Sequence, residues 1–116
     1  MAIELWDFRS DVGHERADLR GMSVEALDGA VGKVEEMVQE PEASFLVVDT
    51  GPWILGKKVL LPAGLVSGID VDDEFVKVER YKDEIKGAPE FDRERRGEPA
   101  YRDALTRHYG AAQPKA

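Results

Sequence analysis

The amino-acid sequence predicts a mainly β domain, built as a small antiparallel barrel or sandwich, on three observations. Five short runs of strand length and strand composition can be distinguished between residues 22 and 79. Turn-forming residues separate these runs at short intervals. The first helical pattern begins only after residue 80. Short strands at this spacing are typical of small barrels and sandwiches.

The densest apolar sequence, residues 45–65, predicts two paired strands. Residues 45–50 (FLVVDT) are mostly β-branched or large and apolar, which suits a buried pleated surface. A glycine and a proline follow and end this strand, because proline has no N–H to donate to a ladder. The second strand is predicted over residues 57–61, where Pro62 stops it.

An earlier hairpin is predicted over residues 21–39. Met22, Val24 and Ala26 alternate with their neighbours at the period of two that a strand requires. Asp28-Gly29 is the predicted turn, because glycine tolerates positive φ and aspartate supports such turns.

The return strand of that hairpin is less regular. Its alternation slips near Glu35-Glu36, which predicts a β-bulge. A helix over residues 33–39 is the alternative, but two nearby glycines and the lack of a capping residue argue against it. Residues 63–68 are expected to connect to the last strand, residues 74–79, with a turn at residues 70–73.

The composition narrows the classes of function. The chain has 116 residues, enough for one domain, and 42% of them are hydrophobic. It has no cysteine, which excludes disulfides, thiolate metal sites and a thiol nucleophile and fits a cytoplasmic location. No apolar run approaches the roughly 18 to 20 residues of a membrane span, and no signal peptide is expected. The net charge of −8 disfavours binding to nucleic acid or anionic lipid.

Residues 1–20 are expected to form an N-terminal arm rather than a disordered tail. Tails seldom carry two large aromatic residues, and this segment holds both Trp6 and Phe8. We therefore expect the arm to lie over the barrel wall, with Trp6 or Phe8 as its anchor.

A short helical turn is expected near residues 81–85, and a second helix near the C-terminus. Pro99 occupies a favoured first helical position, and Gly110 occupies a favoured position just past a helix end. One face of this helix carries Tyr101, Leu105 and His108 or Tyr109. So short a helix is marginal in water, so it is expected to dock on another surface.

Four stretches together resemble the PRC-barrel domain family. Residues 21–34 (GMSVEALDGAVGKV) resemble its opening hairpin, and residues 45–51 (FLVVDTG) and 58–62 (KVLLP) resemble its central strands. Residues 82–92 (KDEIKGAPEFD) look like the short helix and the Ala-Pro-acidic-aromatic sequence that close the domain. The resemblance divides the chain into an N-terminal arm (1–20), a PRC-barrel domain (21–92) and a C-terminal extension with a short amphipathic helix (93–116).

The resemblance implies a partly open β-barrel that binds other proteins, with no catalytic residues and no cofactor. The family is named for the cytoplasmic part of the photosynthetic reaction-centre H subunit. It also includes the C-terminal domain of a ribosome maturation factor and many free-standing bacterial and archaeal proteins. The expected absence of a membrane anchor and of a second domain argues against the roles of those two relatives.

The candidate catalytic and binding motifs are incomplete. Residues 51–58 (GPWILGKK) approach a P-loop, but Lys58 stands where Mg²⁺ needs a hydroxyl, and a strand follows instead of a helix. The acids of residues 70–74 lack the glycine and glutamate spacing of an EF-hand. His14 and His108 are not in a metal-ligand spacing. The arginines after residue 92 are interpreted as a solvated helix face or as a face that meets the acidic barrel, rather than as a phosphate-binding arm. No metal site and no nucleotide site are expected.

The sequence thus favours a non-enzymatic interaction module of the cytoplasm, one that forms a homodimer or docks on another protein. An apolar hairpin tip and the aromatic arms supply the candidate interface residues, which are Trp53, Ile54, Leu55, Trp6, Phe8, Tyr101, Leu105 and Tyr109. One alternative is a barrel that binds a small apolar or anionic ligand in its mouth. A second is an RNA-processing or ribosome-associated adaptor, which one branch of the family suggests and the acidic charge opposes.

Overall fold

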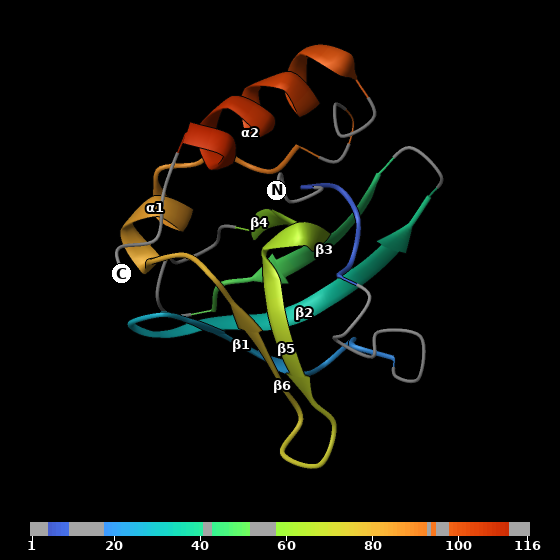
Figure 1. The fold of residues 1–116 in the computed structure, drawn as a ribbon, viewed down its shortest axis with the longest axis vertical. Helices are drawn as coiled ribbons and strands as arrows, with labels where there is room; N and C mark the ends of the chain where they lie inside the picture. The colour runs from blue at the N-terminus through green and yellow to red at the C-terminus, as the bar shows by residue number, and fades with distance from the viewer. Residues whose placement is uncertain are drawn as a thin grey trace.

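The computed structural model describes residues 5–9, 18–40, 43–51, 58–92, 94 and 98–111. In chain order the elements are β1 (Ser23–Ala26), β2 (Gly29–Gln39), β3 (Ser44–Asp49), β4 (Lys58–Pro62), the 3-10 turn η2 (Ala63–Leu65), β5 (Val66–Asp70), β6 (Phe75–Val78), α1 (Lys82–Lys86) and α2 (Pro99–Ala111). The strands form one sheet in the order β4-β3-β2-β1-β6-β5. The sheet curves around a core without closing, and α2 lies across one end of it (Figure 1). The predicted mainly β, partly open barrel is confirmed.

One pair of strands departs from the antiparallel pattern that the sequence predicts. β1 and β6 run parallel, with Ser23 beside Phe75 and Glu25 beside Lys77. All the other neighbouring pairs of this sheet are antiparallel. The parallel pair arises because the chain crosses from β4 through η2 to the far side of β1, where the β5–β6 hairpin is laid down.

The first hairpin forms as predicted, with its turn one residue earlier. Ala26 pairs with Gly29, so Leu27 and Asp28 form the connection. Gly29 has φ of 144°, a conformation that favours glycine. The register of β2 against β3 shifts between Val34 and Glu36, which confirms the predicted bulge.

The prediction of five strands is wrong, because residues 66–70 form a sixth. The sequence places this stretch in a connection and a turn, since Ser67-Gly68 is a common turn pair. In the structure Val66 pairs with Val78 and Gly68 pairs with Lys77, and the extra residue, Ser67, is taken up by a bulge.

The core is formed mainly by β3, β4 and one face of α2. β3 is buried from Ser44 to Val48, and β4 is buried from Val59 to Pro62. Tyr101 of α2 joins the same apolar cluster. The two strands predicted within the densest apolar sequence therefore supply a large part of the core.

The two helices form, and α2 is longer than predicted. α1 begins after Tyr81, whose N–H donates to Glu84 Oε1 at 3.3 Å, and it buries Ile85. α2 begins at Pro99 but continues through Gly110, so the prediction that Gly110 lies beyond the helix end is wrong. Gly110 is exposed, and a single glycine in a last turn costs only about 1 kcal/mol relative to alanine.

Candidate interaction surface

The N-terminal arm is bonded to the barrel through its backbone. The Leu5 carbonyl accepts a hydrogen bond from the Gly64 amide at 2.7 Å. The Trp6 carbonyl accepts one from the Ser44 amide, also at 2.7 Å. Because η2 and the start of β3 supply the donors, residues 5–9 of the arm lie against the barrel as the sequence predicts.

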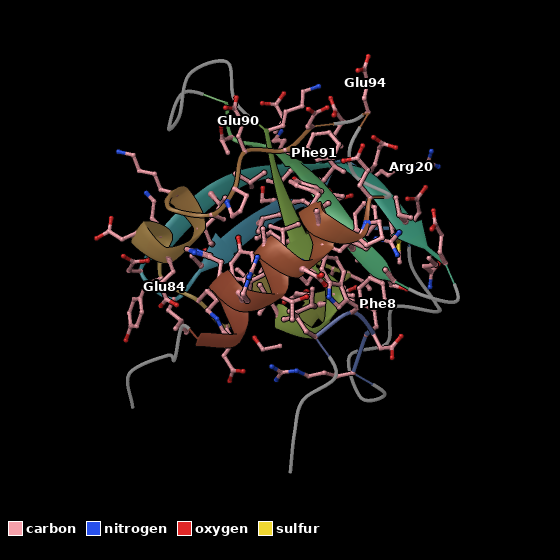
Figure 2. The ribbon with its side chains drawn as sticks, turned by 90° about the horizontal axis from the view of Figure 1, so that it is seen from above. Phe8, Arg20, Glu84, Glu90, Phe91 and Glu94 are labelled. Carbon is pink, nitrogen blue, oxygen red and sulfur yellow. The ribbon has the colours of Figure 1, made fainter. Side chains whose placement is uncertain are left out.

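The aromatic residues of the arm contact their own chain. The Trp6 indole N–H donates to Thr106 Oγ1 of α2 at 2.9 Å, and its ring meets Phe45 edge-on with centroids 6.3 Å apart. Such a pair contributes about 0.5–1.5 kcal/mol beyond the burial of its area. Phe8, labelled in Figure 2, is half-buried and packs against the core. Trp6 therefore ties the arm, β3 and α2 together.

Arg9 adds a charged link between the arm and the end of β6. Its Nε donates to the Gly64 carbonyl at 3.1 Å, and its Nη2 donates to Glu79 Oε2 at 2.6 Å. Both side chains keep partial contact with water, with exposed fractions of 25% and 36%. Because water screens the two charges, the ion pair contributes little to the free energy of unfolding.

The three predicted residues of α2 are all covered by the chain itself. Tyr101 is 5% exposed, and Leu105 and Tyr109 are fully buried. In the view from above, α2 lies over the curved sheet (Figure 2). The docking of the C-terminal helix is therefore confirmed, and these side chains pack within the chain.

Side-chain to backbone hydrogen bonds fix α2 in place. The Tyr101 hydroxyl donates to the Glu90 carbonyl at 3.2 Å. His108 Nε2 lies 2.6 Å from the Glu84 carbonyl of α1, so the bonded tautomer carries its proton on Nε2. Each bond of this kind contributes about 0.5–1.5 kcal/mol.

The Tyr109 hydroxyl is a buried polar group without a hydrogen-bond partner among the described residues. Arg80 lies close by and donates from Nη2 to the Tyr109 carbonyl at 2.9 Å. Burial raises the pKa of the Tyr109 phenol well above its ordinary value, and the neighbouring Tyr101 adds to the rise. The phenol is therefore neutral at all physiological pH values.

A surface ion pair precedes β1. The Arg20 guanidinium and backbone amide both donate to the Asp18 carboxylate, with the shortest contact at 2.6 Å. These bonds lower the pKa of Asp18 to about 2 and raise the pKa of Arg20. Both groups face water, so the pair serves the local turn rather than a buried site.

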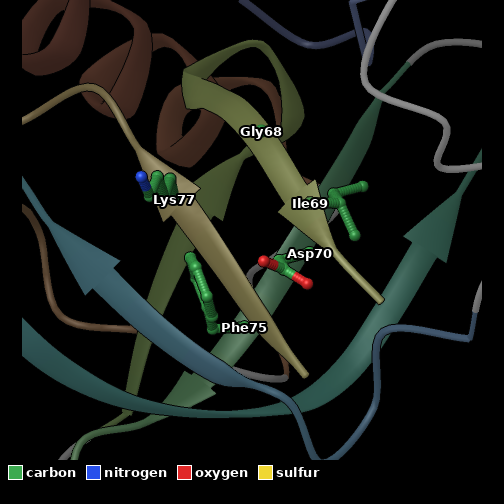
Figure 3. A pocket seen from close by; sticks show the side chains of 5 residues that line it. All are labelled: Gly68, Ile69, Asp70, Phe75 and Lys77. Atoms are coloured by element: carbon green, nitrogen blue, oxygen red, sulfur yellow. The ribbon is translucent and has the colours of Figure 1, made fainter. Parts of the chain in front are cut away.

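The outer face of the β5–β6 hairpin presents a different kind of surface. The pairs Gly68–Lys77 and Asp70–Phe75 place these four side-chain positions on one face. A shallow hollow of about 190 Å³ lies there, lined by these residues and by Ile69 (Figure 3). Gly68 has no side chain to fill the space, and a Cβ built on it meets nothing within 4 Å.

The turn that joins β5 to β6 is acidic and carries an exposed apolar residue. Residues 70–74 (DVDDE), called the acidic tip below, supply four carboxylates, and no ion pair joins them to a cation among the described residues. Val71 at its centre is 54% exposed. Asp70 Oδ1 accepts a hydrogen bond from the Asp73 amide at 2.9 Å and shapes the turn. The acidic tip lies at the opposite end of the molecule from α2 (Figure 1).

The predicted hairpin tip, Trp53, Ile54 and Leu55, lies outside the described residues. Its role at an interface stays a prediction. The sequence did not single out the β5–β6 surface, because residues 66–70 were assigned to a connection. The signal available was the pair Val66 and Ile69 before an acidic turn.

Two absences are limited to the part of the chain that the structure describes. No group of three histidine, aspartate or glutamate side chains is arranged to hold a metal ion there. Neither helix in that part is long and apolar enough to cross a membrane.

The geometry agrees with comparison to known proteins. A comparison with curated proteins finds no match. The family model of the PRC-barrel domain matches residues 11–85, which is more than half of the chain and spans all six strands and most of α1. The chain therefore belongs to the PRC-barrel domain family.

Proposed function

We propose that this protein is a non-catalytic protein-interaction module of the cytoplasm, which self-associates or docks on a protein partner. The observation that carries the proposal is the contrast between its covered and uncovered surfaces. The arm and α2 cover one end of the barrel with Trp6, Tyr101 and Leu105. At the other end, β5 is the last strand of the sheet, only β6 pairs with it among the described residues, and Val71 is exposed. Accessible strand edges and apolar residues at a projecting turn are features of interaction sites.

The proposal keeps the connection between β3 and β4 as a second contact. Trp53, Ile54 and Leu55 place three large apolar side chains in one loop, where polar residues are usual. Tryptophan is also enriched among the residues that dominate interface energies. We expect Trp53→Ala to abolish association while it leaves the monomer folded.

The small-ligand alternative receives less support from the described geometry. The hollow on β5–β6 has about 190 Å³, whereas drug-sized ligands occupy clefts of roughly 300–1,000 Å³. Within the barrel, apolar side chains such as Leu46 and Leu60 fill the interior. The RNA-associated alternative is opposed by the net charge of −8, which repels phosphate.

Two measurements test the proposed function. Light scattering behind a sizing column measures whether the mass exceeds the 12.9 kDa of one chain, as a homodimer requires. Affinity capture of the tagged full chain from its host, followed by mass spectrometry, identifies protein partners. A protein that stays monomeric at high micromolar concentration and captures no partner above the Trp53→Ala control contradicts the proposal.

A further inference from the structure

We propose that the outer edge of β5 binds an extended segment of another protein in which basic and apolar residues alternate. The inference rests on the proposed interaction function and names the chemistry of the partner. It depends on the backbone of β5, on the two faces of that strand and on the charge of the acidic tip.

β5 is the last strand in the sheet order, and among the described residues only β6 pairs with it. Such an edge presents N–H and C=O groups that a further strand can bond. The bulge at Ser67 distorts the base of β5 and limits the regular edge to Gly68–Asp70, after which Val71 begins the turn. The site therefore fits a short strand of a few residues, added by main-chain hydrogen bonds.

The two faces of β5 differ in chemistry, and a strand beside it must match both. Gly68 and Asp70 lie on the outer face, beside the hollow over Phe75. Ile69 alternates to the opposite face, where it packs against the core, and the exposed Val71 follows at the start of the turn. In Figure 3 the Ile69 side chain projects away from the strand on which Phe75 and Lys77 lie. Polar and apolar residues must therefore alternate in the partner.

The charge of the acidic tip determines which polar residues fit. Four carboxylates lie within residues 70–74, and the cation nearest in the ladder, Lys77, is directed over the Phe75 ring at 5.6 Å. The whole chain carries a net charge of −8 as well. Lysine or arginine beside Asp70 would be attracted to the tip and steered toward it at low salt.

A second copy of this chain fits the same edge poorly. Stable dimers bury about 800 Å² on each partner, and an edge of three regular residues supplies only a small part of that, although it suffices for a short peptide strand that binds weakly. Two copies would also bring together two chains of charge −8. Any homodimer should therefore form through another surface.

Amide NMR spectra of the full chain provide the test, with synthetic peptides as probes. The first probe is a short capped peptide of alternating lysine and valine. Two control peptides replace lysine by glutamate, or carry N-methyl groups on alternate residues so that strand hydrogen bonds cannot form. We expect the first peptide to give saturable shifts at Gly68, Ile69 and Val71, and both controls to give none.

A pair of charge-reversal variants separates the tip from general electrostatics. Asp72→Lys changes the exposed acidic tip, whereas Asp103→Lys makes the same change on the exposed face of α2, at the other end. We expect Asp72→Lys to weaken binding about three- to tenfold at low salt, and Asp103→Lys to change it less than about twofold.

Each other outcome counts against the proposal. The proposal is overturned if the lysine–valine peptide causes no shifts, or if its shifts map outside β5. It is also overturned if Asp72→Lys leaves the binding unchanged, or if the N-methylated peptide binds equally well. Shifts at β5 that depend on protein concentration without peptide would assign the edge to a second copy. Because affinity capture and light scattering do not depend on these peptides, the proposed function can survive the failure of this inference.

Discussion

Replacing Gly32 by alanine should separate β2 from the end of β3. A Cβ built on Gly32 lies 2.0 Å from the Asp49 carbonyl oxygen and 2.9 Å from Thr50 Cα. Ordinary contact begins near 3.4 Å, so the carbonyl would have to move by roughly 1.4 Å. Both obstructing atoms are backbone atoms at the end of β3, so they cannot yield as a flexible side chain would.

The expected cost of Gly32→Ala follows from two contributions. Overpacking of a well-packed region costs about 1–3 kcal/mol. The displaced strand also weakens the neighbouring ladder where Lys33 pairs with Asp49, and a lost hydrogen bond costs about 0.5–1.5 kcal/mol. The free energy of unfolding should fall by about 2–4 kcal/mol, and the Tm by about 10–20 °C for a domain of this size.

Gly68→Ala is the matched control, because it makes the same chemical change in another strand. No atom lies within 4 Å of a Cβ at Gly68, so its stability should stay within about 1 kcal/mol of the parent protein. Thermal and urea unfolding followed by circular dichroism measure both variants. If Gly32→Ala melts together with Gly68→Ala, the strands do not approach each other this closely.

Two further predictions concern α2. Burial raises the pKa of Tyr109, so its contribution to stability is full below about pH 10 and is lost as the pH rises further. In urea unfolding, the free energy of unfolding of Tyr109→Phe should equal that of the parent protein at pH 7 and should fall less steeply at alkaline pH. Tyr101→Phe should lose about 0.5–1.5 kcal/mol of that free energy, because its hydrogen bond to the Glu90 carbonyl is removed. Equal behaviour of the two variants would contradict this prediction. In the same assay, Leu105→Ala should lower the free energy of unfolding by about 2–5 kcal/mol, because Leu105 is fully buried. The control Asp103→Ala, at an exposed position of the same helix, should lower it by less than about 0.5 kcal/mol. A small loss for Leu105→Ala would mean that α2 is not docked.

Local patterns predicted most of the elements because each element carries its own period of apolar residues. The alternation of Met22, Val24 and Ala26 identified β1, and the slip at Glu35-Glu36 identified the bulge. The helical spacing of Tyr101 and Leu105 predicted which face of α2 is buried. In each case the period of the apolar residues matches the period of the element.

The parts of the fold that local patterns do not predict depend on pairings between segments distant in the sequence. β5 is stabilised by β6 and by the crossover that places this hairpin beside β1, and no local pattern reports such a pairing. Ser67-Gly68 carries a turn signal that the ladder overrides. The hollow at Gly68 and the open edge follow from that ladder, so the candidate surface could not be predicted without the topology.

The two edge strands of the sheet, β4 and β5, are protected against further strand pairing in different ways, and this difference affects which partners can bind. At the β4 edge, Val59–Pro62 are buried, and α1 packs nearby. Burial and a terminal proline both block further pairing there. At the β5 edge, protection consists of the bulge at Ser67 and the carboxylates of residues 70–74. The bulge shortens the regular edge for any added strand, whereas the carboxylates repel an identical acidic edge and attract a basic strand. We therefore expect the β5 edge to disfavour copies of this chain and to favour a partner of opposite charge.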